Sequence, residues 1–308
     1  MISLKTIISP ITRKNNCSKI RSFSIQQIKD FYLYDLRIDV FEYFSNIDSL
    51  DLYKCNDTGI RFFIPNSIEG NGDFYAQLQQ YSWYYLPAKW EHLETLKYLP
   101  QKGKLLEIGC GKGDFLSMAK DKGISVEGIE LNNYAAKQAR YAGLNVHTQT
   151  LDKFLHQGNS EKFDFVCVYQ VLEHVADVKS FLDNAIACLK HGGHLFISVP
   201  NMNTFLKYDD GGILNFPPHH QGWYNHDVMY NLQNWFPIKL IKVSNEKLQS
   251  EHFNWFHKNM LVKSYKIGKI FGAIYFRTTI NKKFRYYVTK FLSNFIDGHT
   301  MMAVYQKK

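Results

Sequence analysis

The chain of 308 residues has a net charge of +9, and 45% of its residues are hydrophobic while 16% are aromatic. This length can bury a large core, in one large domain or two small ones. No run reaches the ~18 apolar residues that span a bilayer, which argues against a membrane-spanning protein. Pro10 interrupts the apolar N-terminal stretch and no small-residue cleavage site follows, so we expect a cytoplasmic protein without a signal peptide.

The charge is distributed unevenly along the chain. Residues 239–308 hold 14 basic and 3 acidic residues, and residues 1–30 hold 6 and 1, whereas the middle of the chain holds 17 and 24. Basic ends on a mildly acidic core allow contact with a membrane surface or with an anionic substrate. For the basic, aromatic residues 263–296 we therefore consider peripheral contact with the inner face of the membrane. A dimer contact, a substrate lid and a plain solvated helical insertion are the alternatives, and the oligomeric state stays open.

The first third of the chain reads as a cap region. We expect residues 1–24 to be a flexible N-terminus and residues 25–99 to form the cap. A helical pattern covers 25–44, a short strand pair lies around 52–63, and 73–99 forms one or two helices that break near Pro87. Trp83 and Tyr84 are candidates to line a substrate site, although plain packing against the sheet explains each of them as well.

Apolar segments alternate with helical segments in the rest of the chain. We expect core strands at 104–109, 124–129, 144–148, 163–169 and 194–199, and two more at 239–243 and 301–306. Such alternation predicts an α/β fold with a mostly parallel sheet that is covered on both faces. The expected boundaries are 100–250 for the core, 251–297 for a basic, aromatic helical insertion, and 298–308 for the last strand.

One segment joins an apolar strand to a helix through Glu107 and three alternating glycines, Gly109, Gly111 and Gly113. Glycine lets the backbone approach a ligand closely and adopt positive φ without strain. The spacing differs from the G-x-G-x-x-G turn of dinucleotide-binding enzymes, which disfavours a nicotinamide dehydrogenase. Alone, the turn is a weak signal of a nucleotide-like ligand.

Glu130 ends the next expected strand, 23 residues after Glu107. An acidic residue at the end of the second strand of a βαβ unit can accept both hydroxyls of a ribose. A solvated loop carboxylate is the alternative, but the strand, the turn and the spacing all favour the ribose role.

The glycine turn, Glu130 and the later Asp152 resemble class I S-adenosylmethionine-dependent methyltransferases. Residues 163–175 resemble the fourth-strand segment of that family, and residues 189–201 resemble its segment leading into the fifth strand. Flanking pieces that are similar to a bacterial subgroup acting on small molecules or on sugars of surface glycans lie at 53–59, 83–92 and 214–220. With them the resemblance covers roughly residues 30–255.

This resemblance implies a Rossmann-like, seven-stranded, mostly parallel sheet with helices on both faces. It adds an N-terminal helical and small-strand cap and a helical insertion before the last strand. It also implies S-adenosylmethionine as the cofactor. The residues that would bind this cofactor are Glu107, Gly109, Cys110, Gly111, Gly113, Glu130, Leu131, Asp152, Gln170 and Val171.

Methylation of a hydroxyl requires a group that removes the proton of the acceptor. His219 and His220 follow two prolines after the fifth strand, where substrate loops enter this fold, and His174 follows the fourth strand. Histidine titrates near neutral pH, so each is a candidate base, with His219 slightly preferred over His220. A structural role is the alternative for every one of them, and for His174 it is the favoured one.

Aromatic residues near these histidines are candidates to hold the acceptor. Trp223 and Tyr224 could stack on a sugar or another ring. His252 and Trp255 are weaker candidates for the rim of the same pocket. The five cysteines include no C-x-x-C pair, so we expect no zinc site and assign no metal-binding residues.

We therefore expect an enzyme, an S-adenosylmethionine-dependent methyltransferase that methylates an oxygen of a small molecule or of a sugar or glycan precursor. The alternatives are C- or N-methylation, a lipid-linked acceptor, and a non-catalytic cofactor-binding or interaction protein. A nucleic-acid acceptor is disfavoured, because no Asn-Pro-Pro-Tyr-type motif follows the fourth strand to hold a flipped base.

Overall fold

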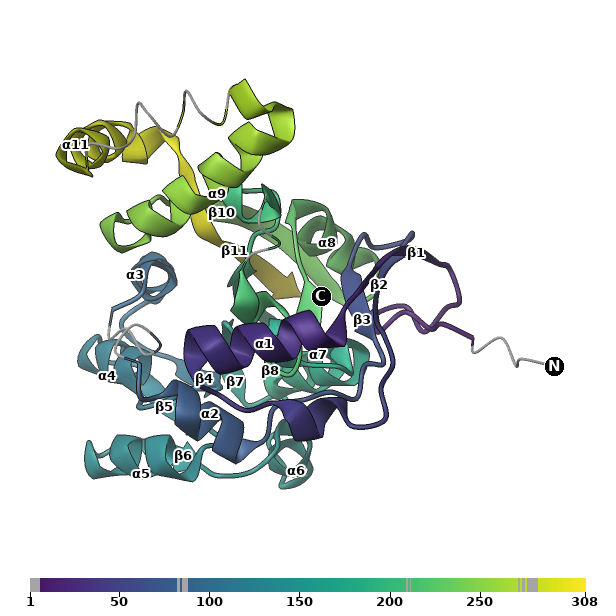
Figure 1. The fold of residues 1–308 in the computed structure, drawn as a ribbon. Coiled ribbons are helices and arrows are strands. Elements are labelled where there is room, and N and C mark those ends of the chain that lie inside the picture. Colours follow the sequence, from purple (N-terminus) through teal and green to yellow (C-terminus); the bar gives the residue numbers. More distant parts are fainter. Residues whose placement is uncertain are drawn as a thin grey trace.

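The structure is a computed structural model that describes residues 6–81, 84, 88–208, 210, 212–270, 272, 275 and 282–308. Within these residues two β-sheets form the framework (Figure 1), and the larger one has the strand order β10-β11-β8-β7-β4-β5-β6. Its strands are β4 (Lys104–Ile108), β5 (Ser125–Ile129), β6 (Asn145–His147), β7 (Phe163–Tyr169), β8 (Leu189–Pro200), β10 (Ile238–Lys247) and β11 (Asp297–Lys307).

Most strands of this sheet are parallel. Strands β8, β7, β4, β5 and β6 run in one direction, whereas β11 pairs antiparallel with β8 and β10 pairs antiparallel with β11. The predicted seven-stranded Rossmann-like sheet is thereby confirmed. Strands β10 and β11 are longer than predicted, because their mutual pairing continues as far as Lys247 and Asp297.

Strand β7 shows how the sheet is covered on both faces. Val166 and Val168 pack in one apolar cluster together with α6, α7 and α8, while Phe165 and Cys167 pack in another with α3, α4 and α5. Alternate side chains of a strand point to opposite faces, so a continuous apolar run is what a doubly covered strand requires. The helices are α3 (Trp90–Leu96), α4 (Asp114–Asp121), α5 (Asn133–Tyr141), α6 (Leu151–His156), α7 (Val178–Cys188) and α8 (His226–Asn231).

The cap region contains a smaller antiparallel sheet in the order β1-β2-β3-β9. Its strands are β1 (Cys17–Phe23), β2 (Leu50–Cys55), β3 (Arg61–Ile64) and β9 (Gly222–Trp223). The predicted strand pair is β2 with β3, while β9 comes from the segment after β8 and ties the cap to the core. Helices α1 (Ile25–Leu36) and α2 (Gly72–Leu78) share an apolar cluster with this sheet.

Helix α1 is shorter than the predicted 25–44 helix. Arg37 adopts a left-handed conformation with φ of 50°, and the N–H of Ile38 donates to the carbonyl of Tyr32 at 3.1 Å. This arrangement ends a helix, because it satisfies a terminal carbonyl while the chain turns away.

The described residues also form short 3-10 turns. These are η1 (Phe41–Phe44), η2 (Leu172–His174), η3 (Phe205–Tyr208), η4 (Ile213–Asn215), η5 (Leu232–Asn234), η6 (Ser250–His252) and η7 (Ser293–Phe295).

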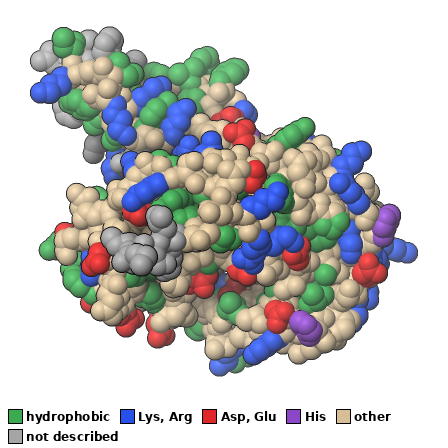
Figure 2. Space-filling model, turned by 90° about the vertical axis from the view of Figure 1, so that its right-hand side faces the viewer, with side chains coloured by type: hydrophobic (Ala, Val, Ile, Leu, Met, Phe, Trp, Pro, Cys, Tyr) green, Lys and Arg blue, Asp and Glu red, His purple; other side chains and the backbone are tan. Residues whose placement is uncertain are grey.

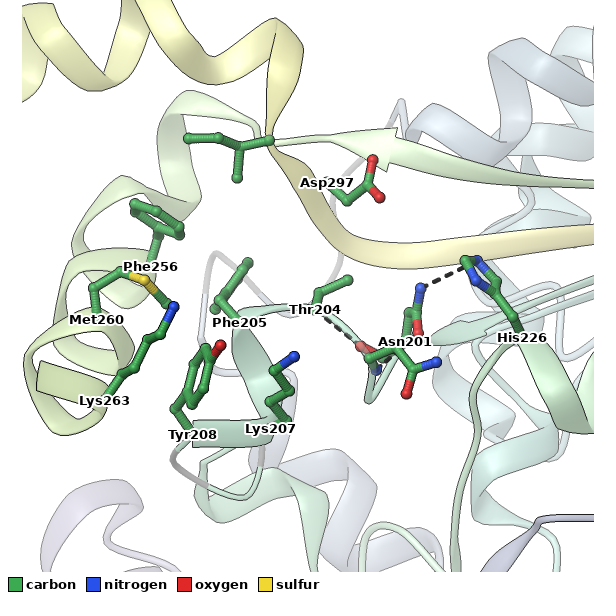
Figure 3. A pocket seen from close by; sticks show the side chains of 12 residues that line it. Asn201, Thr204, Phe205, Lys207, Tyr208, His226, Phe256, Met260, Lys263 and Asp297 are labelled. Atoms are coloured by element: carbon green, nitrogen blue, oxygen red, sulfur yellow. Dashed lines mark hydrogen bonds between the residues drawn. The ribbon is translucent and has the colours of Figure 1, made fainter. Parts of the chain in front are cut away.

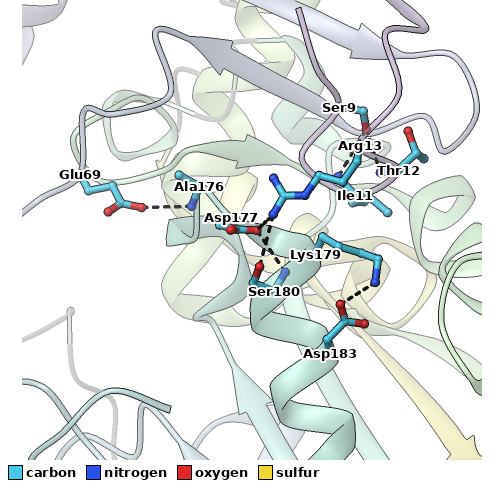
Figure 4. A network of polar contacts seen from close by, with 10 residues as sticks. All are labelled: Ser9, Ile11, Thr12, Arg13, Glu69, Ala176, Asp177, Lys179, Ser180 and Asp183. Atoms are coloured by element: carbon cyan, nitrogen blue, oxygen red, sulfur yellow. Dashed lines mark hydrogen bonds and ion pairs between the residues drawn. The ribbon is translucent and has the colours of Figure 1, made fainter. Parts of the chain in front are cut away.

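The described part of the N-terminal segment, residues 6–24, lies against the core, and the flexibility assigned to residues 1–24 stays a prediction from the sequence. Strand β1 pairs with β2, and Ile11 is fully buried in the main apolar cluster. Arg13 forms an ion pair with Asp177, the N-cap residue of α7 (Figure 4). Burial of the Ile11 side chain, together with these contacts on α7, accounts for the attachment.

The segment before the last strand is helical where it is described, with α9 (Phe253–Ile267) and α11 (Lys282–Leu292). Both helices lie in the upper part of Figure 1, above the sheets. Phe253 and Trp255 of α9 pack with the apolar cluster of the cap. The boundaries assigned at residues 100, 251 and 298 stay predictions from the sequence.

Candidate active site

A cavity of about 1290 Å³ lies at the carboxyl ends of the parallel strands. Gly109 follows β4, Glu130 follows β5 and Gln170 follows β7, and all three line this cavity. The carboxyl ends of adjacent parallel strands are where α/β folds bind their ligands. The cavity is therefore the candidate active site.

The glycine turn exposes main chain where side chains would interfere. Gly109, Gly111 and Gly113 all have positive φ, at 76°, 54° and 84°. A Cβ on Gly109 would lie 2.4 Å from Cγ2 of Val171, and a Cβ on Gly113 would lie 2.3 Å from Cδ1 of Leu144. Both the backbone conformation and the close packing therefore require glycine here.

Glu130 links this turn to the start of α5. One carboxylate oxygen, Oε2, accepts the N–H of Gly111 at 2.8 Å, and the other, Oε1, accepts the N–H of Asn132 at 2.7 Å. Burial raises the pKa of Glu130, and these main-chain hydrogen bonds partly offset that rise. Each carboxylate oxygen keeps a second lone pair, so the group can still accept hydroxyls from the cavity.

Two further buried carboxyl groups have oxygens without a hydrogen-bond partner among the described residues. Oε2 of Glu107 and both carboxyl oxygens of Glu173 are buried without a hydrogen bond. Burial raises the pKa of Glu107 well above its usual range and raises the pKa of Glu173 to about 8. Orphaned buried acceptors are costly. Glu173 lines the cavity and Glu107 does not, so the ammonium group of S-adenosylmethionine could donate to Glu173, and the residues present fit this cofactor.

The other residues assigned to the cofactor fall into two groups. Leu131, Gln170 and Val171 line the cavity. Cys110 is buried, and its Sγ lies against Gly128, so this position can offer a ligand only its main chain.

Asp152, which was assigned to the cofactor, does not line the cavity. Its side chain is exposed in the first turn of α6 and pairs with His156, whose Nδ1 lies 3.4 Å from Oδ1. Thr150 and Leu151 line the cavity in its place. Because α6 begins at Leu151, the next residue turns toward solvent on the helix surface.

His174, His219 and His220 meet on the wall of the cavity. Their ring centroids are 4.5 to 4.9 Å apart. Each ring directs Nδ1 at an oxygen. Nδ1 of His174 lies 2.7 Å from the carbonyl oxygen of His219, and Nδ1 of His219 lies 2.8 Å from the carbonyl oxygen of Leu214. Nδ1 of His220 lies 2.9 Å from Oδ1 of Asn215. Since an oxygen acceptor requires an Nδ1–H donor, the lone pair in each neutral ring is on Nε2.

The three rings differ in what their Nε2 atoms contact. Nε2 of His219 lies 3.1 Å from the hydroxyl of Tyr84, whereas Nε2 of His220 has no hydrogen-bond partner within the described part of the chain. Burial lowers the pKa of His174 to about 4. Burial and the neighbouring rings hold the pKa values of His219 and His220 well below the usual range, so all three histidines are neutral at pH 7.

Trp223 and Tyr224 are buried away from the cavity, which corrects the expectation that they stack on a substrate. The indole N–H of Trp223 donates to the carbonyl of Asn215 at 2.6 Å, and the hydroxyl of Tyr224 donates to the carbonyl of Leu172 at 3.1 Å. The pairing of β9 with β3 buries the segment that contains Trp223 and Tyr224 in the core. Tyr84 lines the cavity, and Trp83 lies outside the described residues.

Some cavity residues were not assigned from the sequence. Asn215 lies in the same flanking motif as His220, but only the histidines of that motif suggested chemistry. Glu173 is adjacent to His174 in the sequence, and this adjacency was the signal that could have indicated a place for Glu173 at the site. Glu246 and His299 come from β10 and β11 and have no local signal, because only the strand pairing brings them together.

A second pocket of about 420 Å³ lies between η3 and α9 (Figure 3). Tyr208 of η3 faces Met260 and Lys263 of α9 across it. None of the glycine-turn residues or of the three clustered histidines lines this pocket. It is therefore separate from the candidate active site.

Residues 83–262 match the methyltransferase domain family. The chain belongs to this family. The methyltransferase is 26% identical over 234 residues to the ubiquinone biosynthesis O-methyltransferase of Vibrio atlanticus (strain LGP32), which covers 72% of this chain and 91% of the relative. It is 28% identical over 177 residues to the protein of the same name from Vibrio vulnificus (strain YJ016), and this match covers 54% of this chain and 72% of the relative.

Among solved structures, the methyltransferase is similar to the PH0226 protein from Pyrococcus horikoshii OT3. The TM-score is 0.50 at 15% identity, over 78% of this chain and 100% of that chain, which is a likeness of fold alone. With the family match, the chain is a class I enzyme that uses S-adenosylmethionine as its cofactor. Within the described ranges, no helix combines the length and apolar character that crossing a bilayer requires.

Proposed function

We propose that this methyltransferase methylates an oxygen of a small molecule or of a sugar or glycan precursor, with His220 as the general base. The observation that carries the proposal is the Nε2 atom of His220, which lies in a ring that lines the cavity and has its other nitrogen held by Asn215. The names of the Vibrio relatives favour oxygen as the accepting atom.

When bound, S-adenosylmethionine supplies an electrophilic methyl group. The hydroxyl of the acceptor must lose its proton as the new carbon–oxygen bond forms, and Nε2 of a neutral imidazole can accept that proton. Burial holds the pKa of His220 far below its usual range, so the ring is unprotonated at neutral pH. His220 is preferred over His219, because both ring nitrogens of His219 have partners in Leu214 and Tyr84.

His220→Ala and His220→Gln test the assignment. The loss of a general base should lower kcat by roughly 10²- to 10⁴-fold, while the affinity for S-adenosylhomocysteine, measured by calorimetry, should stay within about twofold of the wild-type value. The matched control is His156→Ala, because that histidine is 75% exposed on α6 and does not line the cavity. Wild-type turnover in both His220 variants would remove the base assignment.

Isotope labelling can find the acceptor in a mixture of candidate compounds. The enzyme is incubated with deuteromethyl-labelled S-adenosylmethionine and a small-molecule and glycan-precursor extract, and labelled products are isolated and their methyl positions determined by NMR. A methyl ether supports the proposal, whereas a label on carbon, on nitrogen or in a lipid-linked product selects one of the alternatives. Cofactor binding without any labelled product selects the non-catalytic alternative.

We also propose that the end of the helical insertion contacts the anionic inner face of a membrane. Residues 252–296 contain no acidic residue. Tyr287 and Phe291 of α11 and the nearby Phe295 are 68%, 78% and 81% exposed. Figure 2 shows blue basic and green apolar side chains next to one another on the upper lobe of the molecule. A helix of this kind can insert its aromatic side chains at a lipid interface while its cations contact anionic headgroups.

Vesicle co-sedimentation tests this contact with phosphatidylserine-containing and pure phosphatidylcholine vesicles. The wild-type protein should pellet with the anionic vesicles and be released by salt, and Phe291→Ser with Phe295→Ser should reduce pelleting. The control is Tyr141→Ser on α5, which removes an equally exposed aromatic residue elsewhere on the surface. Equal pelleting of all three proteins, or equal binding to both vesicle types, would contradict the proposal.

A further inference from the structure

A second cluster of ligand-type side chains lines the cavity outside the assigned residues. Glu246 of β10, His252 of η6 and His299 of β11 each offer one nitrogen or oxygen, and these atoms lie within 4.8 Å of one another. Oε2 of Glu246 is 3.2 Å from Nδ1 of His299, and the His252 and His299 ring centroids are 4.4 Å apart. All three residues line the cavity.

Backbone irregularity brings these residues together. The pairing of β10 with β11 changes register between Asn245 and Lys247, so Glu246 lies opposite the shifted part of β11. A Cβ on Gly298 would lie only 2.9 Å from Oε2 of Glu246, so the carboxylate packs directly on glycine main chain. Register shifts of this type re-aim side chains and are frequent beside functional sites.

The cluster is not satisfied by the protein itself. The Glu246 side chain is 6% exposed, and its Oε2 makes no hydrogen bond with any described residue, because its 3.2 Å contact with Nδ1 of His299 lacks hydrogen-bond geometry. Nδ1 of His252 is also buried without a partner. The hydroxyl of Thr300 lies 3.2 Å from Nε2 of His299. A buried carboxylate beside two imidazoles is costly unless a cation accompanies it.

We propose that Glu246, His252 and His299 bind one divalent first-row transition-metal ion, of which Zn²⁺ is the representative. Two imidazoles and one carboxylate are the donor set that such ions prefer. Three protein ligands leave at least one coordination position open to another ligand, and all three side chains line the cavity.

An ion at this location would have two effects on the protein. His252 precedes α9, whereas Glu246 and His299 belong to the large sheet, so the ion joins the helical insertion to the core. An oxygen of the acceptor that reaches this wall can occupy the open position. Only this acceptor role rests on the proposed function, since metal binding by the three side chains does not depend on methyl transfer.

Metal binding can be measured directly on the full chain after removal of metal with a chelator. Titration with Zn²⁺ against a competing indicator should give one site per chain, and Co²⁺ should give the visible absorption of a low-symmetry nitrogen and oxygen site. Zn²⁺ should also raise Tm, because it binds only the folded state. Glu246→Gln and His299→Ala should weaken binding by more than the roughly 10- to 100-fold cost of losing an outer-sphere partner.

Two control variants distinguish this site from the other histidines of the chain. His156→Ala removes an exposed histidine and should bind Zn²⁺ as the wild type does, whereas His174→Ala tests whether the ion sits in the three-histidine cluster instead. Because Glu246→Gln keeps the shape of the side chain and removes a buried charge, its metal-free Tm should not fall. A lost Tm rise then reports lost binding rather than misfolding.

The proposal is overturned if the wild type binds no Zn²⁺ or Co²⁺. It is also overturned if Glu246→Gln and His299→Ala bind as tightly as the wild type, or if His174→Ala alone abolishes binding. S-adenosylhomocysteine is titrated into the same metal-free samples. Failure of that titration contradicts the proposed function and leaves the metal result standing.

Discussion

Nδ1 of His220 donates a hydrogen bond to Oδ1 of Asn215 across 2.9 Å. The orientation of the amide is set independently, because Nδ2 of Asn215 donates to the carbonyl of Asp210 at 2.7 Å. The amide oxygen is thus held toward the imidazole, and the lone pair of the ring is held on Nε2. Asn215 therefore acts as a positioning residue for the base that we propose.

Asn215→Ala should lower kcat by about 10- to 100-fold without changing the affinity for S-adenosylhomocysteine, because the ring of His220 can then flip or change tautomer. The change should appear in kcat more than in KM. Asn159→Ala is the control, since its Nδ2 donates to the carbonyl of Phe154 at 2.7 Å far from the histidine cluster. An unchanged kcat with a lowered Tm would show that Asn215 is only structural.

Glu130 should control recognition of the ribose of the cofactor. A hydrogen bond to a charged group contributes about 1.5–3 kcal/mol, so the wild type should bind S-adenosylhomocysteine about 10- to 150-fold more tightly than its 2′-deoxy analogue. Glu130→Ala should bind both ligands weakly and with similar affinity. Calorimetry with the two ligands measures this difference, and retained discrimination in Glu130→Ala would exclude the ribose role.

Gly113 and Gly158 form a matched pair for testing the glycine turn. Both have positive φ, at 84° and 79°, but a Cβ on Gly113 would lie 2.3 Å from Leu144, whereas a Cβ on Gly158 would contact nothing within 4 Å. Both Ala variants carry the cost of the left-handed conformation, about 1 kcal/mol. Gly113→Ala should cost about 1–3 kcal/mol more in the free energy of unfolding, because of overpacking.

Urea denaturation measures this difference, and Leu144→Ala supplies a further check. In the Leu144→Ala background the additional cost of Gly113→Ala should shrink, since the clashing methyl group is gone. Equal destabilisation by Gly113→Ala and Gly158→Ala would mean that the turn can shift to accept a side chain.

Glu173 should make the stability of the ligand-free protein depend on pH. Burial raises its pKa to about 8, well above the usual value near 4.5, so the folded state retains a proton that the unfolded state has lost. The free energy of unfolding should therefore fall as pH rises from about 4.5 to 8, by up to about 1.4 kcal/mol per pH unit.

Glu173→Gln cannot titrate, so its stability curve should be flatter over the same interval and should lie above that of the wild type near pH 8. Urea midpoints measured between pH 5 and pH 8.5 compare the two proteins. Glu161→Gln, which removes a 66% exposed carboxylate, provides the baseline for losing one acidic group. Parallel curves for wild type and Glu173→Gln would show that Glu173 titrates normally in the folded protein.

Local patterns in the sequence were sufficient for the large sheet. The central strands β4 and β7 are apolar runs, and every expected core strand overlaps a strand of the large sheet. Glycine spacing also predicted the turn, because positive φ and close approach depend on a few adjacent residues. These features follow from interactions within a span of about ten residues.

The positions of individual side chains relative to the cavity and the core were predicted less well. Asp152 has the expected place after the third strand, but one residue of helical phase turns it into solvent. Trp223 and Tyr224 are adjacent to the histidine segment, yet the pairing of β9 with β3 makes them core. The flexible N-terminus was expected from its place at the end of the chain, which does not reveal the burial of Ile11.

The sequence by itself therefore determined the α/β fold class and the glycine turn, because strand periodicity and glycine spacing are local properties, and its resemblance to class I methyltransferases implied the cofactor. Only the tertiary structure decided which side chains share the cavity. Asn215 with His220, and Glu246 with His252 and His299, come together through loop packing and a register shift between two strands. Such contacts depend on long-range packing, which no local pattern encodes.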